Sequence, residues 1–119
     1  MARARRERPR VPSHEYHGAD GAVIVLRGTL SPPTRASYAR IASGEDLPPA
    51  AAREDAWQRA VEFLFERLAV SWTIAGLEPL SGQRELLARF RVASAGERAW
   101  LRECLREHCA SKFPELQAP

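Results

Sequence analysis

The clearest pattern of hydrophobic and polar positions lies between residues 54 and 72. Apolar side chains recur there at α-helical spacing and form one broad face: Trp57, Ala60, Val61, Leu64, Phe65, Leu68 and Trp72. Most of the charged side chains fall on the opposite face. The pattern predicts an amphipathic helix of about five turns. In a chain of 119 residues, we expect such a helix to form the main wall of the core.

Two short stretches before this helix predict a β-hairpin. Residues 14–17 and 22–28 flank an Asp20-Gly21 pair, and an Asp-Gly pair next to a β-branched run is typical of a tight hairpin turn. The second stretch is apolar at consecutive positions. We therefore expect other elements to cover both of its faces.

Further helices are indicated by their start signals. Ser31 followed by two prolines predicts a short helix over residues 34–42, and a second helix is expected over residues 82–92. Ser94 and Glu97 have the spacing of a capping box, which predicts a helix ending near Lys112. Its expected core side chains are Trp100, Leu101, Cys104, Leu105 and His108.

These elements together predict an α+β fold, in which an N-terminal β-hairpin packs on a mainly helical body of three to four helices. Residues 14–119 are expected to form one domain. Residues 1–13 are rich in arginine and poor in apolar side chains, so we expect them to be a disordered tail.

Charge is distributed unevenly along the chain. The whole sequence carries a formal charge of +3. The first ten residues account for +4 and leave −1 for the other 109, because one glutamate accompanies Arg3, Arg5, Arg6, Arg8 and Arg10. These arginines are the candidate contacts if the protein is a small nucleic-acid-binding accessory factor. Because the other 109 residues are nearly neutral, we rank nucleic-acid binding below protein binding as the function.

The expected location is the cytoplasm. No apolar run approaches the roughly twenty residues that span a bilayer, and no apolar segment of a secretory signal follows the basic N-terminus. Membrane association is therefore not expected.

Candidate chemistry is sparse. His14, His17, Cys104 and His108 could form a tetrahedral zinc site if the hairpin packs on the last helix, but their spacing matches no zinc motif. Neither Cys104 nor Cys109, paired with His108, has a visible third group that would orient the base. A glycine-rich phosphate loop is also missing from the sequence. We therefore expect neither enzymatic activity nor a cofactor or metal.

Two apolar residues depart from the pattern of the long helix. Phe63 and Val70 lie seven positions apart and share a line on its polar side. They can form an apolar stripe for a protein partner, with Tyr38 nearby, or they can be covered by the short helix that carries Tyr38 and Ile41. Both interpretations are open at this point. In the first, Phe63, Val70 and Tyr38 are the partner-binding residues.

The order of these elements resembles a known family. A strand ending at residues 25–32, a long helix ending in Val70-Ser71-Trp72-Thr73-Ile74, and Pro79-Leu80 before further helix are similar to the tail assembly chaperones of long-tailed phages and prophages of GC-rich bacteria. The resemblance implies a small, largely helical or α+β domain without catalytic residues. It also implies that the protein binds and solubilises the tape measure protein, or a tail tube protein, in the cytoplasm of the bacterial host.

Overall fold

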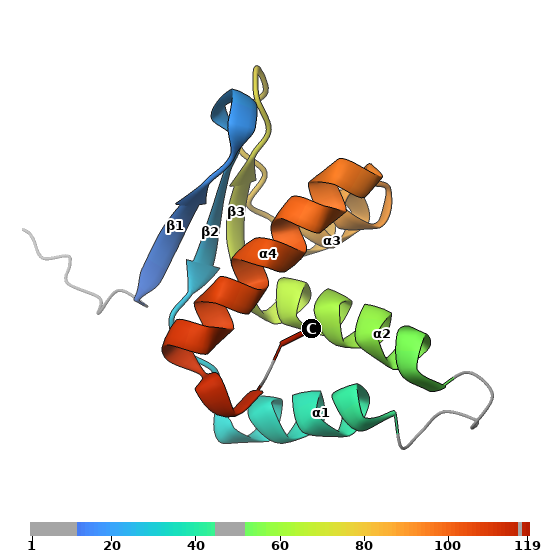
Figure 1. Ribbon diagram of the computed structural model, residues 1–119. Coiled ribbons are helices and arrows are strands. Elements are labelled where there is room, and N and C mark those ends of the chain that lie inside the picture. The colour runs from blue at the N-terminus through green and yellow to red at the C-terminus, as the bar shows by residue number, and fades with distance from the viewer. Residues whose placement is uncertain (1–11, 45–51, 117) are drawn as a thin grey trace, which may run out of the picture.

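The computed structural model describes residues 12–44, 52–116 and 118–119. The predicted arginine-rich tail lies outside these residues except for its last two positions. The fold is α+β, as predicted, and its described residues form three strands and four α-helices (Figure 1). In chain order the elements are β1 (Ser13–His17), β2 (Val23–Arg27), α1 (Pro32–Ser43), α2 (Ala52–Leu68), β3 (Ala69–Thr73), α3 (Gln83–Arg91) and α4 (Ala95–Lys112). A short 3-10 turn, Pro114–Leu116, follows α4.

The predicted hairpin is present. Strands β1 and β2 pair in antiparallel fashion, with Ser13 opposite Arg27 and His17 opposite Val23. The turn between them places Asp20 at φ 59° and Gly21 at φ 79°. Asparagine, aspartate and glycine tolerate this left-handed region best, which explains why an Asp-Gly pair forms this turn.

The predicted C-terminal boundary of the long helix is wrong. Helix α2 stops at Leu68, and the next five residues form β3, which pairs with β2. Trp72 therefore lies on a strand, opposite Ile24, and is still buried. The register shifts between Val25 and Leu26, so that Val70 is the additional residue of a β-bulge. Leu68 and Trp72 are four residues apart, a spacing that would place both on the same face of a helix. The sequence pattern therefore does not reveal that the helix ends at Leu68.

Helix α2 is the centre of the core, as predicted. It contacts α1, α3, α4 and β3. Phe65 stacks on Phe90 of α3 with ring centroids 4.6 Å apart, and it meets Trp72 edge-on at 5.9 Å. The buried side chains of α2 are Ala56, Ala60, Val61, Leu64, Phe65 and Leu68. Trp57 was expected among them, but 46% of its surface is exposed, so that prediction is wrong.

Among the described residues, helices cover one face of the sheet only. Ile24 and Leu26 point into the core and are fully buried, whereas Val23 and Val25 alternate with them and are half-buried. Glu15, also on the outer face, is exposed. The described helices lie together on the inner side of the sheet, with α4 crossing it (Figure 1). The expectation that both faces of β2 are covered is therefore wrong.

The ends of the helices follow local chemistry. Ser31 caps α1 by accepting a hydrogen bond from the Thr34 amide, and Gly44 ends this helix at φ 72°. Ser94 and Glu97 form the predicted capping box at the start of α4, with bonds of 2.9 and 3.1 Å. The capping box thereby fixes the residue at which α4 begins.

Candidate functional site

One apolar hollow on the described surface is a groove between α2 and the first half of α4. Its volume is about 630 Å³. Both helices and the end of α3 contribute to its lining, which consists of Trp57, Gln58, Val61, Glu62, Phe90, Ala95, Arg98, Ala99 and Arg102. We call it the α2–α4 groove.

The floor of the groove is apolar and firmly supported. Val61 and Phe90 are nearly buried, and Phe90 is held from below by its stack on Phe65. Trp57 lies one turn before Val61 on the same face of α2 and is about half exposed. The groove therefore presents the half-exposed ring of Trp57 beside a nearly buried apolar floor.

The α4 wall combines small and basic side chains. Ala95 and Ala99 are four residues apart and exposed, and Arg98 and Arg102 have the same spacing. The Arg98 guanidinium donates to the backbone carbonyl of Arg91 at 2.7 Å and lies 5.8 Å from the centre of the Phe90 ring. Within the described residues, the Nε atom of Arg102 is buried and has no hydrogen-bond partner.

The corner between α3 and α4 is fixed by ion pairs. Arg89 donates to Glu97 at 2.7 Å, and this hydrogen bond is the main reason why the pKa of Glu97 is lowered. Arg91 donates two hydrogen bonds, of 3.1 and 3.2 Å, to the two carboxylate oxygens of Glu62 on α2. That pairing raises the pKa of Arg91.

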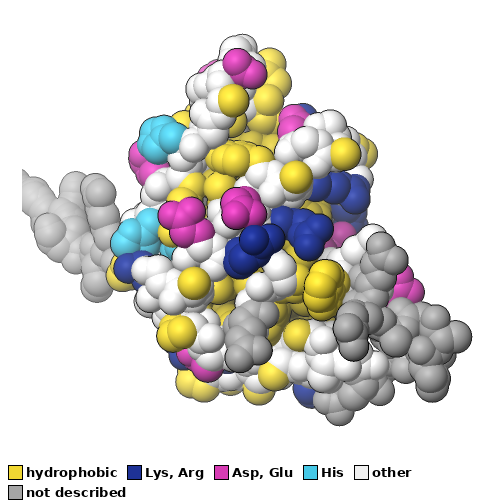
Figure 2. All heavy atoms as spheres, in the orientation of Figure 1, with side chains coloured by type: hydrophobic (Ala, Val, Ile, Leu, Met, Phe, Trp, Pro, Cys, Tyr) yellow, Lys and Arg dark blue, Asp and Glu magenta, His cyan; other side chains and the backbone are white. Residues whose placement is uncertain are grey.

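The charge of the α2–α4 groove is positive. Glu62 is the only acidic side chain among the described residues of its lining, and Arg91 neutralises it. Neither Arg98 nor Arg102 has a carboxylate partner among the residues that the structure describes. Figure 2 shows the corresponding surface, where basic side chains gather along α4 and border hydrophobic surface.

The three predicted partner-binding residues do not form a common surface stripe. Tyr38 is only 1% exposed, and Phe63 is half-buried against the core with Arg67 stacked 5.0 Å from its ring centre. Val70 belongs to the bulge of β3 rather than to the helix. The expected line of Phe63 and Val70 on one helical face is therefore wrong, because the helix ends between them. Whether any of the three binds a partner stays a prediction.

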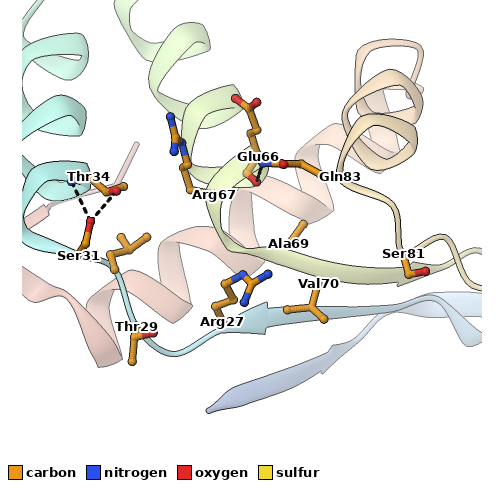
Figure 3. Close-up of a pocket in the computed structure, with 11 residues that line it drawn as sticks. Arg27, Thr29, Ser31, Thr34, Glu66, Arg67, Ala69, Val70, Ser81 and Gln83 are labelled. Carbon is orange, nitrogen blue, oxygen red and sulfur yellow. Dashed lines mark hydrogen bonds between the residues drawn. The ribbon is translucent and has the colours of Figure 1, made fainter. Parts of the chain in front are cut away.

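Val70 lines a second, more polar hollow of about 470 Å³ between the start of α1, the end of α2 and β3. Figure 3 shows its side chain there, with Arg27 on one side and Ser81 on the other. The start of α1 adds few hydrogen-bond donors to this hollow. Pro32 and Pro33 have no backbone N–H, and the next amide is already bound to Ser31. The charged hydrogen-bond donors of this hollow are therefore the side chains of Arg27 and Arg67 rather than the start of the helix.

The residues considered for zinc have other contacts. Both ring nitrogens of His108 are engaged: Nε2 donates to the Arg27 carbonyl at 2.6 Å, and Nδ1 accepts from the Tyr16 hydroxyl at 2.8 Å. The ring of His14 lies 5.8 Å from that of His108, while His17 is exposed and pairs with Glu15 at 3.2 Å. The described part of the chain contains no cluster of three or more potential metal ligands. A metal-free protein stays a prediction.

The cysteines are poor candidates for nucleophilic chemistry. Cys104 and Cys109 are both free thiols and both buried. Burial raises the pKa of each to about 11, so that both are protonated at neutral pH. The thiolate that covalent catalysis requires is therefore scarce.

Comparisons of the chain with protein-family models, with curated proteins and with solved structures give no match. None of the described helices is both long and apolar enough to cross a membrane. Arg3, Arg5, Arg6, Arg8 and Arg10 lie outside the described residues.

Sequence reasoning missed the residues of the α2–α4 groove. It assigned Trp57 to the core and did not single out Arg98 or Arg102. One signal was available, since arginine recurs every fourth residue at positions 98, 102 and 106, beside Ala95 and Ala99. Such a row predicts a basic helix face, but the groove itself depends on how far α4 lies from α2.

Proposed function

We propose that the protein functions by binding another protein in the α2–α4 groove, without catalysing a reaction. The observation that carries this proposal is the half-exposed Trp57 above the apolar floor formed by Val61 and Phe90. Tryptophan is enriched among the residues that dominate binding energy at protein interfaces. Leaving it in water has a free-energy cost that a partner would remove.

The position of Trp57 distinguishes it from other exposed apolar residues. Three large hydrophobic side chains are exposed in the described part of the chain: Trp57, Leu77 and Val92. Only Trp57 lines the groove. Single exposed apolar residues are common on protein surfaces, whereas an exposed tryptophan continuous with an apolar floor is typical of a binding site.

The more specific proposal is that the protein is a phage tail assembly chaperone. Such a chaperone would cover apolar segments of a tape measure or tail tube protein before assembly. The resemblance rests on residues 70–74 and on Pro79-Leu80. Trp72 and Leu80 exchange two backbone hydrogen bonds of 2.9 Å, so these residues support the edge of the sheet rather than the groove. The resemblance thus bears on the scaffold, and the groove supplies the binding surface.

The proposal can be tested by co-expression with a tape measure protein that is insoluble when it is expressed alone. The wild-type chain should keep that protein soluble, and Trp57→Ala should fail to do so while remaining folded. Val92→Ala is the matched control, because Val92 is 75% exposed but lies outside the groove lining. Equal solubilisation by the wild type and Trp57→Ala would show that the partner binds elsewhere.

A further inference from the structure

We infer that the segment bound in the α2–α4 groove is an amphipathic helix with carboxylates beside its apolar stripe. This inference rests on the proposed function and specifies the chemistry of the partner. It depends on two features of the groove, namely the spacing of the residues along its walls and the sign of its charge.

The spacing of the walls suits an α-helix. Trp57 and Val61 are four residues apart on α2, and Ala95 and Ala99 are four apart on α4. Rows with this spacing form the ridges and grooves into which the side chains of a third helix can pack. The two alanines have short side chains, so a partner backbone can approach α4 closely. Apolar residues at every third or fourth position of the partner would then reach Trp57.

The charges around the groove select an acidic helix. Arg98 and Arg102 lie at its edge without a carboxylate partner among the described residues, and Glu62 is already neutralised by Arg91. Arginine and carboxylate form short, charge-assisted hydrogen bonds. A partner helix with glutamates or aspartates beside its apolar stripe would supply these bonds, whereas a basic helix would meet two like charges.

Glu97, in the first turn of α4, is paired with Arg89, and the other acidic side chains of α4 lie beyond the groove. Glu103 pairs with Arg106 at 3.1 Å, and neither residue contributes to the groove lining. At the groove end of α4, Arg98 and Arg102 are therefore the charged side chains without a carboxylate partner among the described residues, and basic side chains gather along this helix (Figure 2). This arrangement gives Arg106 the role of a matched control, since it carries the same charge on the same helix but lies outside the site.

The test uses two designed peptides of about 18 residues, or five helical turns. Both carry the same leucine stripe, and the flanking positions are glutamate in one and lysine in the other. Isothermal titration calorimetry with the full chain should show that the glutamate peptide binds about tenfold more tightly, as expected for two partly exposed ion pairs. The difference should decrease as the salt concentration rises.

Variants separate the groove from the arginine-rich N-terminus, which also attracts acidic peptides. Arg98→Glu combined with Arg102→Glu should reverse the preference, whereas Arg106→Glu should preserve it. If the double charge reversal does not fold, Arg98→Gln with Arg102→Gln should reduce the preference to about twofold or less. Trp57→Ala should abolish binding of the glutamate peptide. A preference that survives these changes would refute the inference.

Other outcomes distinguish this inference from the proposed function. If both peptides bind equally and Trp57→Ala abolishes both, the groove binds protein, but its preference for an acidic helix is wrong. If neither peptide binds, the acidic-helix inference is overturned, and the co-expression experiment still decides on protein binding. If duplex DNA competes with the glutamate peptide for Arg98 and Arg102, the site recognises polyanions rather than a helix, which also overturns the inference.

Discussion

His108 on α4 donates a 2.6 Å hydrogen bond to the backbone carbonyl of Arg27, at the end of β2. Its other ring nitrogen accepts from Tyr16 on β1. The fully buried imidazole thus joins the last helix to both strands of the hairpin. A carbonyl oxygen can only accept, so Nε2 carries the proton and Nδ1 is the acceptor of a neutral ring.

This arrangement predicts that acid destabilises the fold through His108. Burial is the main cause that lowers the pKa of His108, and the nearby His14 and Lys112 lower it further. The unfolded chain therefore binds this proton at a higher pH than the folded chain does. The free energy of unfolding should fall as the pH drops below about 6.5, by at most about 1.4 kcal/mol per pH unit for this one group.

The measurement is urea denaturation of the wild type and of His108→Gln between about pH 5 and pH 8. Glutamine can donate to Arg27 and accept from Tyr16 but does not titrate, so the variant should show a weaker dependence on pH. His17→Gln is the control, because His17 is exposed. Equal slopes for the wild type and His108→Gln would mean that another group causes the loss.

Gly18 is predicted to be required by its contact with Trp100 rather than by its backbone conformation. A Cβ atom at Gly18 would lie 2.6 Å from Cε2 of Trp100. Gly18→Ala should therefore lower the free energy of unfolding by about 1–3 kcal/mol, as overpacking usually does. Gly96→Ala is the control in chemical denaturation, because its Cβ would meet nothing within 4 Å. It should be neutral, or stabilise α4 by up to about 1 kcal/mol. Similar losses in both variants would contradict the steric explanation.

The hydroxyl of Tyr38 should contribute little to stability. It is buried and has no hydrogen-bond partner among the described residues, and burial raises its pKa to about 12. Tyr38→Phe should therefore be neutral, or more stable by up to about 1 kcal/mol. Tyr38→Ala should cost about 3–5 kcal/mol, because the ring fills the core between α1 and its neighbours. A clear loss of thermal stability in Tyr38→Phe would show that the hydroxyl has a partner after all.

Deletion of residues 1–10 should leave the melting temperature unchanged, because these residues are rich in arginine and poor in the apolar side chains that a core requires. Any affinity for DNA should be weak, independent of sequence and strongly dependent on salt, and it should be lost with Arg3, Arg5, Arg6, Arg8 and Arg10. Electrophoretic mobility shifts with two unrelated duplexes can measure this. Sequence-specific binding by the shortened chain would support the nucleic-acid function instead.

Features that depend on neighbouring residues could be predicted from the sequence. The Asp20-Gly21 turn, the Ser31 cap and the pairing of Ser94 with Glu97 arise from chemistry within a few residues. Strand β3 could not be distinguished in this way, since Trp72 continues the spacing of the helix while its burial depends on pairing opposite Ile24.

The groove depends on tertiary packing more strongly than the turns, caps and strands do. Trp57 has the same helical phase as Val61 and Leu64, yet it is exposed while they are buried. Periodicity indicates the direction of a side chain around its helix. It does not indicate where along the helix the covering elements end.

The final prediction compares the α2–α4 groove with the stripe expected from the sequence. Phe63→Ser with Val70→Ser should lower the free energy of unfolding by roughly 1–3 kcal/mol, because Phe63 packs against the core and Val70 occupies the bulge beside β2. Trp57→Ser should cost less, since about half of that side chain is already exposed. In co-expression below the melting temperature of each variant, solubilisation of a tape-measure segment should be lost with Trp57→Ser and retained with the double variant. If the double variant stays as stable as the wild type and loses the partner, Phe63 and Val70 are the binding residues and the groove is not.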